Sequence, residues 1–149
     1  MRRQGFVVCA VVVLLSAVVA AGGVRAQDAR SRSVWDGVYS EAQAERGKGQ
    51  YLQACASCHA QDLRGDSTAP SLVDESFAFL WDDTTVDELF TRIRTLMPSD
   101  RPNSLSPQTY QDIVAFILKS NKFPAGQKDL EAVVEGLRQI RITIRRPDK

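Results

Sequence analysis

The chain has 149 residues, among them 19 basic and 18 acidic side chains, three cysteines and one histidine. This length is enough for one domain, and a net charge of +1 does not indicate a nucleic-acid partner or a polybasic membrane contact. With one histidine and three cysteines, any chemistry that needs these residues is confined to a few positions.

Residues 1–26 have the organisation of a cleaved export signal. Two arginines precede an apolar core at residues 6–21, and the small residue Ala26 precedes Gln27. We expect cleavage after Ala26 and a periplasmic mature chain of 123 residues, in which 16 basic residues face 18 acidic ones. The alternative is an uncleaved anchor, because the 19 residues of the range 6–24 can span a bilayer.

Residues 27–39 begin with small, polar and charged side chains, which predict a flexible lead-in. Ser40, with Gln43 three positions later, has the spacing of a capping box and starts a predicted helix that ends near Ala54. Gly47 inside this helix costs about 1 kcal/mol relative to alanine. A close crossing by another helix would explain that cost.

The predicted helix leads into Cys55-Ala56-Ser57-Cys58-His59. Two thiols three positions apart can bind both vinyl groups of a haem covalently, and the histidine that follows can ligate its iron. The pentapeptide contains the only histidine and two of the three cysteines. It therefore predicts one covalently attached haem c, bound through Cys55 and Cys58, with His59 as an axial ligand.

Three other interpretations of the pentapeptide agree less well with the sequence. A structural zinc site needs four Cys or His ligands, but only Cys9, within the leader, is left outside it. A thioredoxin-type dithiol lies in a βαβ pattern, whereas this one follows a predicted helix. A structural disulfide with this spacing would close too small a loop to restrain the unfolded chain.

The segment after the histidine is expected to form part of the haem pocket. A ligating histidine usually donates its second ring N–H to a carbonyl or carboxylate, and the carbonyl of Pro70 is the candidate acceptor for His59. Leu63 and Leu72 flank this proline as candidate pocket residues. Trp81, in the aromatic stretch that follows, is a candidate donor to a haem propionate.

Two amphipathic helices are predicted in the second half of the chain. The first starts at Thr85 with the spacing of a capping box, and Pro98 ends it. The second has Ser106 as its N-cap and Pro107 at its first position, and it stops at Asn121.

The second axial position of the iron has one candidate in the mature chain. Met1 is removed with the leader, and Met97, which precedes a proline, is then the only methionine. Ligation by His59 and Met97 would raise the potential and suit reversible one-electron transfer. The alternative is that Met97 only fills space at the end of a helix.

From residue 40 to about residue 122 the sequence resembles the class I c-type cytochromes. The resemblance depends on an ordered set of motifs: a helix, the cysteine-histidine pentapeptide, residues 69–72, Met97-Pro98 and a final amphipathic helix. It implies an all-α, cytochrome c-like fold of a few helices around one haem, in which the first and last helices cross. The residues implied at that crossing are Gly47, Tyr51, Tyr110 and Phe116.

A narrower resemblance, at residues 37–47, 62–65, 104–107 and 123–126, is to the single-haem cytochromes of periplasmic quinoprotein dehydrogenases. It implies such a dehydrogenase as one candidate donor, and a terminal oxidase or another cytochrome as the acceptor. We expect a periplasmic electron carrier that is not an enzyme, binds no nucleic acid and contacts a membrane only if the leader is retained. The alternative is a five-coordinate haem enzyme or sensor that acts on peroxide or a small gas.

Residues 127–149 follow the cytochrome domain, which is predicted at residues 40–126. Apolar residues have helical spacing up to Leu137, whereas residues 140–144 alternate with the period of a strand. Because a single strand has no sheet to join in an all-α domain, the simpler interpretation is a packed helix followed by a frayed, basic end. The alternative is that residues 140–149 dock on a redox partner by adding to an exposed sheet edge.

Overall fold

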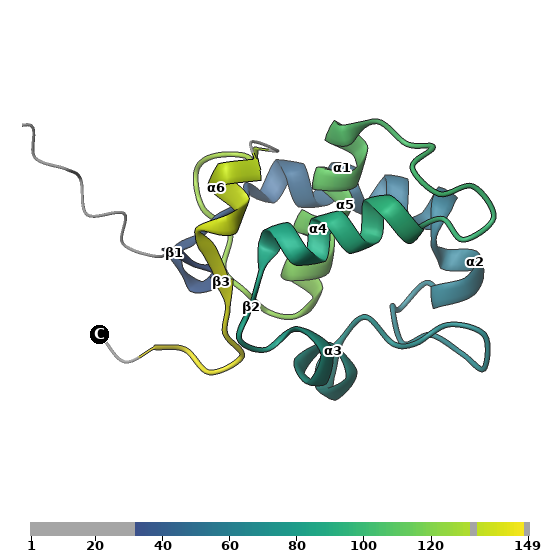
Figure 1. Cartoon of the computed structure of the whole chain (residues 1–149), viewed down its shortest axis with the longest axis horizontal. Coiled ribbons are helices and arrows are strands. Elements are labelled where there is room, and N and C mark those ends of the chain that lie inside the picture. Colours follow the sequence, from purple (N-terminus) through teal and green to yellow (C-terminus); the bar gives the residue numbers. More distant parts are fainter. Residues whose placement is uncertain (1–31, 132–133, 148–149) are drawn as a thin grey trace, which may run out of the picture.

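The computed structural model describes residues 32–131 and 134–147, so the predicted leader and its cleavage site lie outside the described residues. Within these ranges no helix is long and apolar enough to cross a membrane. The fold is mainly helical, as expected, with one small sheet (Figure 1). In chain order the elements are β1 (Arg32–Ser33), the 3-10 helix η1 (Val34–Asp36), α1 (Glu41–Ala54), α2 (Ala56–His59), α3 (Asp74–Trp81), β2 (Thr84–Thr85), α4 (Val86–Leu96), α5 (Pro107–Ser120), α6 (Val134–Arg138) and β3 (Ile140–Ile142).

The crossing of α1 and α5 forms the frame of the molecule. Gly47 of α1 is buried at this crossing, where an added Cβ would lie 1.7 Å from the backbone oxygen of Asp112. One turn later, the rings of Tyr51 and Phe116 pack with their centroids 5.4 Å apart. The predicted close crossing is therefore confirmed, because the backbones could not approach this far around a larger side chain.

The predicted starts of α4 and α5 are also confirmed. Thr85 and Glu88 form both hydrogen bonds of a capping box at the start of α4. Ser106 caps α5 by accepting a hydrogen bond from the backbone of Thr109, and Pro107 occupies the first turn. These caps satisfy N–H groups that have no partner within a helix. They fix where each helix begins.

The capping box predicted at α1 is only half formed. Ser40 accepts a hydrogen bond from the Gln43 backbone, but the Gln43 side chain does not return to Ser40. Instead, this buried amide accepts from the backbone N–H of Leu130 at 2.6 Å and donates to the carbonyl of Leu130 at 3.0 Å. Gln43 therefore attaches the chain that follows α5 to the first helix.

The two ends of the described chain meet in a three-stranded sheet, which the sequence analysis did not predict. β3 is the central strand, parallel to β1 and antiparallel to β2. Ile140 and Ile142 of β3 are 2% and 0% exposed. The expectation that this strand has no sheet to join was wrong, and β3 is not free to add to a partner's sheet because both of its edges are paired.

The prediction of a flexible lead-in was wrong for residues 32–39. Val34 is fully buried, and the ring of Trp35 packs edge-on against Phe123 with a centroid distance of 5.0 Å. The hydroxyl of Tyr39 donates to the carbonyl of Phe123 at 2.6 Å. Together with buried Leu130 and Leu137, these residues belong to a single core that extends across the predicted boundaries at residues 40 and 126.

Candidate cofactor site

A cavity of about 840 Å³ lies beside α2. Its lining includes Cys55, Cys58, His59 and Met97, so the fold brings together the four residues predicted to bind a haem and its iron. The volume is within the usual range for cofactor sites. The large apolar and aromatic side chains in its wall are Tyr51, Leu72, Leu80, Trp81, Ile93, Leu96, Ile113 and Ile117.

The two cysteines lie within one helical turn. The backbone N–H groups of Cys58 and His59 donate to the carbonyl of Cys55 at 3.2 and 3.0 Å, which directs all three side chains toward the same cavity. Cys55 and Cys58 form no disulfide within the described part of the chain, and Cys55 is half-buried whereas Cys58 is exposed. Burial, with a smaller contribution from Cys58, raises the pKa of the Cys55 thiol to about 11.

The imidazole of His59 is buried and held in one orientation. Its Nδ1 lies 2.9 Å from the carbonyl oxygen of Pro70, which confirms the predicted acceptor. Because a carbonyl only accepts, Nδ1 donates the hydrogen in this bond, and the neutral imidazole in this tautomer has the Nε2 lone pair available. The hydroxyl of Tyr51 donates to the carbonyls of His59 at 3.2 Å and Ala60 at 2.7 Å, and its burial raises its pKa.

Ala60 occupies a backbone conformation that favours glycine. Its φ angle is 62°, in the left-handed region that non-glycine residues adopt only rarely. Class I cytochromes often have glycine after the haem histidine, as the resemblance implies, and this chain keeps the conformation with an alanine. The two carbonyls held by Tyr51 lie on either side of this turn.

A compact loop positions the Pro70 carbonyl. Gly65 has a φ of 69°, and a Cβ there would lie 2.3 Å from the backbone oxygen of Ala69. The carboxylate of Asp66 accepts hydrogen bonds from the backbone and hydroxyl of Thr68 at 2.7 and 2.6 Å, and these bonds lower its pKa. The loop therefore holds the acceptor of His59 by local hydrogen bonds and tight backbone packing.

Of the four pocket residues predicted in and after this loop, three line the cavity and one does not. Pro70, Leu72 and Trp81 line the cavity, whereas Leu63 is buried but does not line it. Leu63 has a φ of 65°, and its carbonyl accepts from the backbone of Leu72 at 2.7 Å. In this structure Leu63 closes the base of the loop, and its predicted contact with a haem stays a prediction.

Met97 reaches the cavity from a different part of the chain. It is the residue at which α4 ends, and its carbonyl accepts a hydrogen bond from the hydroxyl of Tyr110 at 2.8 Å. The loop that follows is braced by Arg94, whose Nε donates to the side chain of Asn103 at 2.9 Å. The thioether is therefore carried by a segment that both α4 and α5 fix in place.

Sequence reasoning missed α3 and two basic residues of the lining. The aromatic stretch is a helix in which Phe77 and Trp81, four positions apart, are buried, while Leu80 lines the cavity. This spacing of four residues was the only sign of the helix. Arg92 and Arg101 also line the cavity, and no motif marked them.

These residues fit a haem. The cavity combines an apolar wall with two thiols, a buried imidazole whose Nδ1 is engaged, and a thioether, which are the side chains that attach haem c and ligate its iron. A mainly helical fold around such a cavity is that of a c-type cytochrome.

Residues 42–117 match the family model described as cytochrome C oxidase, cbb3-type, subunit III. The match covers just over half of the chain, which therefore belongs to this family and is a class I c-type cytochrome. The family implies haem c as the cofactor and electron transfer as the activity.

One solved structure is similar to the chain, the sulfane dehydrogenase SoxCD from Paracoccus pantotrophus. The similarity has a TM-score of 0.48 and 22% sequence identity, and it covers 72% of this chain and 61% of that chain. The present chain thus spans less than two thirds of the matched chain. No curated protein matches the sequence.

Proposed function

We propose that this protein is a periplasmic one-electron carrier with a single covalently bound haem c. Cys55 and Cys58 would attach the haem, and His59 and Met97 would ligate its iron. The observation that carries the proposal is that all four side chains line one cavity, although Met97 comes from a separate segment. Export is supported by the sequence of residues 1–26, which resembles a cleaved leader.

The protein side chains have distinct roles in this proposal. A bound haem supplies the exchange of one electron at its iron. The hydrogen bond to Pro70 orients His59 and raises the basicity of the ligating nitrogen. The thioether of Met97, a soft ligand, would favour the reduced iron and raise the potential, and the apolar side chains of the wall would exclude water from a bound haem.

The donor and the acceptor follow from different evidence. The motifs at residues 37–47, 62–65, 104–107 and 123–126 support a quinoprotein dehydrogenase as the donor. The name of the family places related domains in a cytochrome c oxidase, which supports a terminal oxidase as the acceptor.

The ligation is tested by the substitution Met97→Ala in the haem-loaded protein. The oxidised wild-type protein should show a weak thioether-to-iron charge-transfer band in the far red, and the variant should lack it. Its potential should fall by on the order of 0.1 V, out of the roughly 0.8 V that axial ligands span.

The neighbouring substitution Leu96→Ala is the matched control, because Leu96 also lines the cavity but carries no ligating atom. It should keep the band. An unchanged spectrum in Met97→Ala would contradict His/Met ligation and favour the five-coordinate enzyme or sensor.

A further inference from the structure

One exposed aromatic side chain is not explained by the haem cavity. Among the residues that the structure describes, the exposed large apolar side chains are Leu52, Phe79, Leu80 and Leu96. Leu80 and Leu96 line the cavity, so a haem would cover part of their surface. Phe79 does not line the cavity, and it is 89% exposed. A phenyl ring gains much from burial, so this ring is suited to contact with another molecule.

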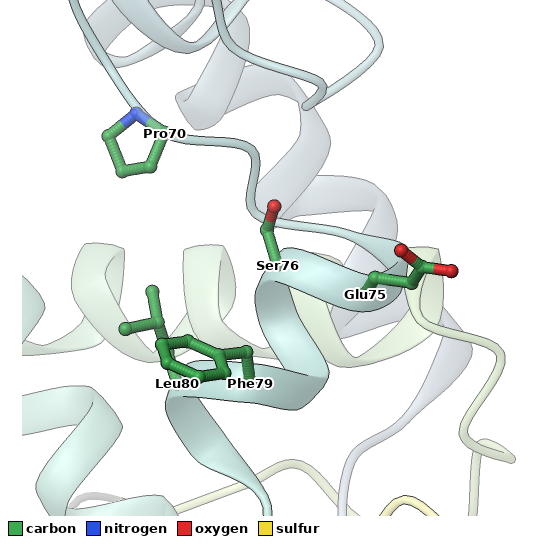
Figure 2. A pocket seen from close by; sticks show the side chains of 5 residues that line it. All are labelled: Pro70, Glu75, Ser76, Phe79 and Leu80. Atoms are coloured by element: carbon green, nitrogen blue, oxygen red, sulfur yellow. The ribbon is translucent and has the colours of Figure 1, made fainter.

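Phe79 lies at a hollow on the outside of α3. The hollow has a volume of about 360 Å³, and its lining consists of Pro70, Glu75, Ser76, Phe79 and Leu80. Figure 2 shows Phe79 and Leu80, both from α3, facing Pro70 of the preceding loop. The lining is therefore mostly apolar, with Glu75 and Ser76 as its polar side chains.

The hollow adjoins the haem cavity. Pro70 and Leu80 line both spaces, so a single layer of side chains separates them. The carbonyl of Pro70 is also the group that accepts the hydrogen bond from His59. A protein that covers Phe79 would thus lie next to the predicted cofactor and its proximal ligand.

The hollow has one carboxylate in its lining, Glu75, and the segment that contains it is acidic. Residues 74–83 include four exposed carboxylates and no basic residue. Two of the carboxylates are paired, Asp74 with Arg64 at 3.1 Å and Asp83 with Arg141. Glu75, which lines the hollow, forms no ion pair within the described part of the chain. An approaching surface is therefore attracted if it is basic and repelled if it is acidic.

We propose that the hollow around Phe79 is the docking surface for a redox partner protein whose contact face is an apolar pocket ringed by lysine and arginine. The phenyl ring enters the pocket as the central anchor, and the carboxylates steer the encounter. A second copy of this chain fits less well, because a two-fold contact at this surface would bring the unpaired Glu75 carboxylates of the two copies toward each other. The docking role depends on the proposed carrier function.

The test uses the haem-loaded protein and membranes and periplasmic extract of the organism that encodes it. Oxidation of the reduced protein by membranes and reduction of the oxidised protein by extract are followed by stopped-flow absorbance. We expect Phe79→Ser to slow at least one of these rates roughly tenfold, as for loss of an interface anchor. Glu75→Lys should slow the same rate at low salt, and the difference should shrink as salt screens the charges.

Two matched variants serve as controls. Leu52→Ser removes another exposed apolar side chain, and Glu135→Lys makes the same charge change on α6. Both should react within about twofold of wild type, a difference below 0.5 kcal/mol. All four variants should keep the wild-type spectrum and potential, which shows that the cofactor is unchanged.

The outcomes separate the docking surface from the carrier function. Wild-type rates in Phe79→Ser would overturn the docking proposal and leave the carrier function intact. A wild-type dimer that Phe79→Ser dissociates, measured by sedimentation, would assign the hollow to self-association and overturn the proposal. A wild-type protein that exchanges no electrons with either fraction would contradict the carrier function itself.

Discussion

The two ends of the molecule differ in how their apolar side chains are covered (Figure 1). At the end that contains α2, side chains surround a cavity of about 840 Å³, and Leu96 of its wall is 49% exposed. At the sheet end, Ile142 is 0% exposed and packs in a core with Val34 and Leu137. The first end presents apolar surface for a haem to cover, whereas the second is closed by the chain's own terminal segments. The sheet end therefore contributes stability that does not depend on the cofactor.

Deletion of residues 140–149 should have the largest effect on this comparison. It removes the central strand, with buried Ile140 and Ile142. Loss of one buried isoleucine costs about 2–5 kcal/mol, and a whole domain has only about 5–15 kcal/mol of stability. We expect the haem-loaded truncated protein to lose its cooperative thermal transition, measured by circular dichroism. Arg145→Ala, an exposed change in the same segment, should leave the transition unchanged.

A truncated protein that unfolds at the full-length temperature would mean that the sheet end is dispensable. Residues 140–149 would then behave as a frayed terminus that does not contribute to stability. The comparison between the two ends would then be wrong.

Gly47→Ala should have the next largest effect, because it acts on the helix crossing that both ends share. The added methyl group would overlap the backbone of Asp112, and we expect a loss of roughly 3 kcal/mol in the free energy of unfolding. Gly49→Ala is the matched control on the same helix. It has no atom within 4 Å of the added Cβ and should stabilise the protein by up to about 1 kcal/mol. Denaturant unfolding of both variants measures the difference, and equal effects would contradict the close crossing.

Gln43→Ala should lower the free energy of unfolding by a smaller amount. It tests whether Gln43 attaches the segment around Leu130 to α1. It leaves the buried N–H and carbonyl of Leu130 without their partner, which we expect to cost about 2 kcal/mol. The Met97-dependent spectrum should not change, since Gln43 does not line the cavity. Gln50→Ala, a half-buried position on the same helix, is the control for denaturant unfolding. A loss of the far-red band in Gln43→Ala would show that the two ends are coupled.

The sequence predicted that two thiols and an imidazole lie together at the cavity, because their pattern is local. Cys55, Cys58 and His59 lie within one turn, so their spacing alone places them together. The acceptor Pro70 was also predictable, since a ligating histidine needs a partner and a short loop limits where one can lie. Leu63, also predicted as a pocket residue, has a left-handed backbone conformation that the sequence does not mark, and it is not among the residues that line the cavity.

The sequence by itself determined the grouping of Cys55, Cys58 and His59, the starts of α4 and α5 and the need for a small residue at position 47, because each depends on residues within a few positions. The tertiary structure decided the sheet and the exposure of Phe79. The strands have only two or three residues, and β1 pairs with β3 through residues as far apart as Arg32 and Ile140. Hydrogen bonds between strands are made with a partner that the local sequence does not specify. Phe79 and Phe77 have the same side chain two positions apart, and only the packing of α3 against the body buries one and exposes the other.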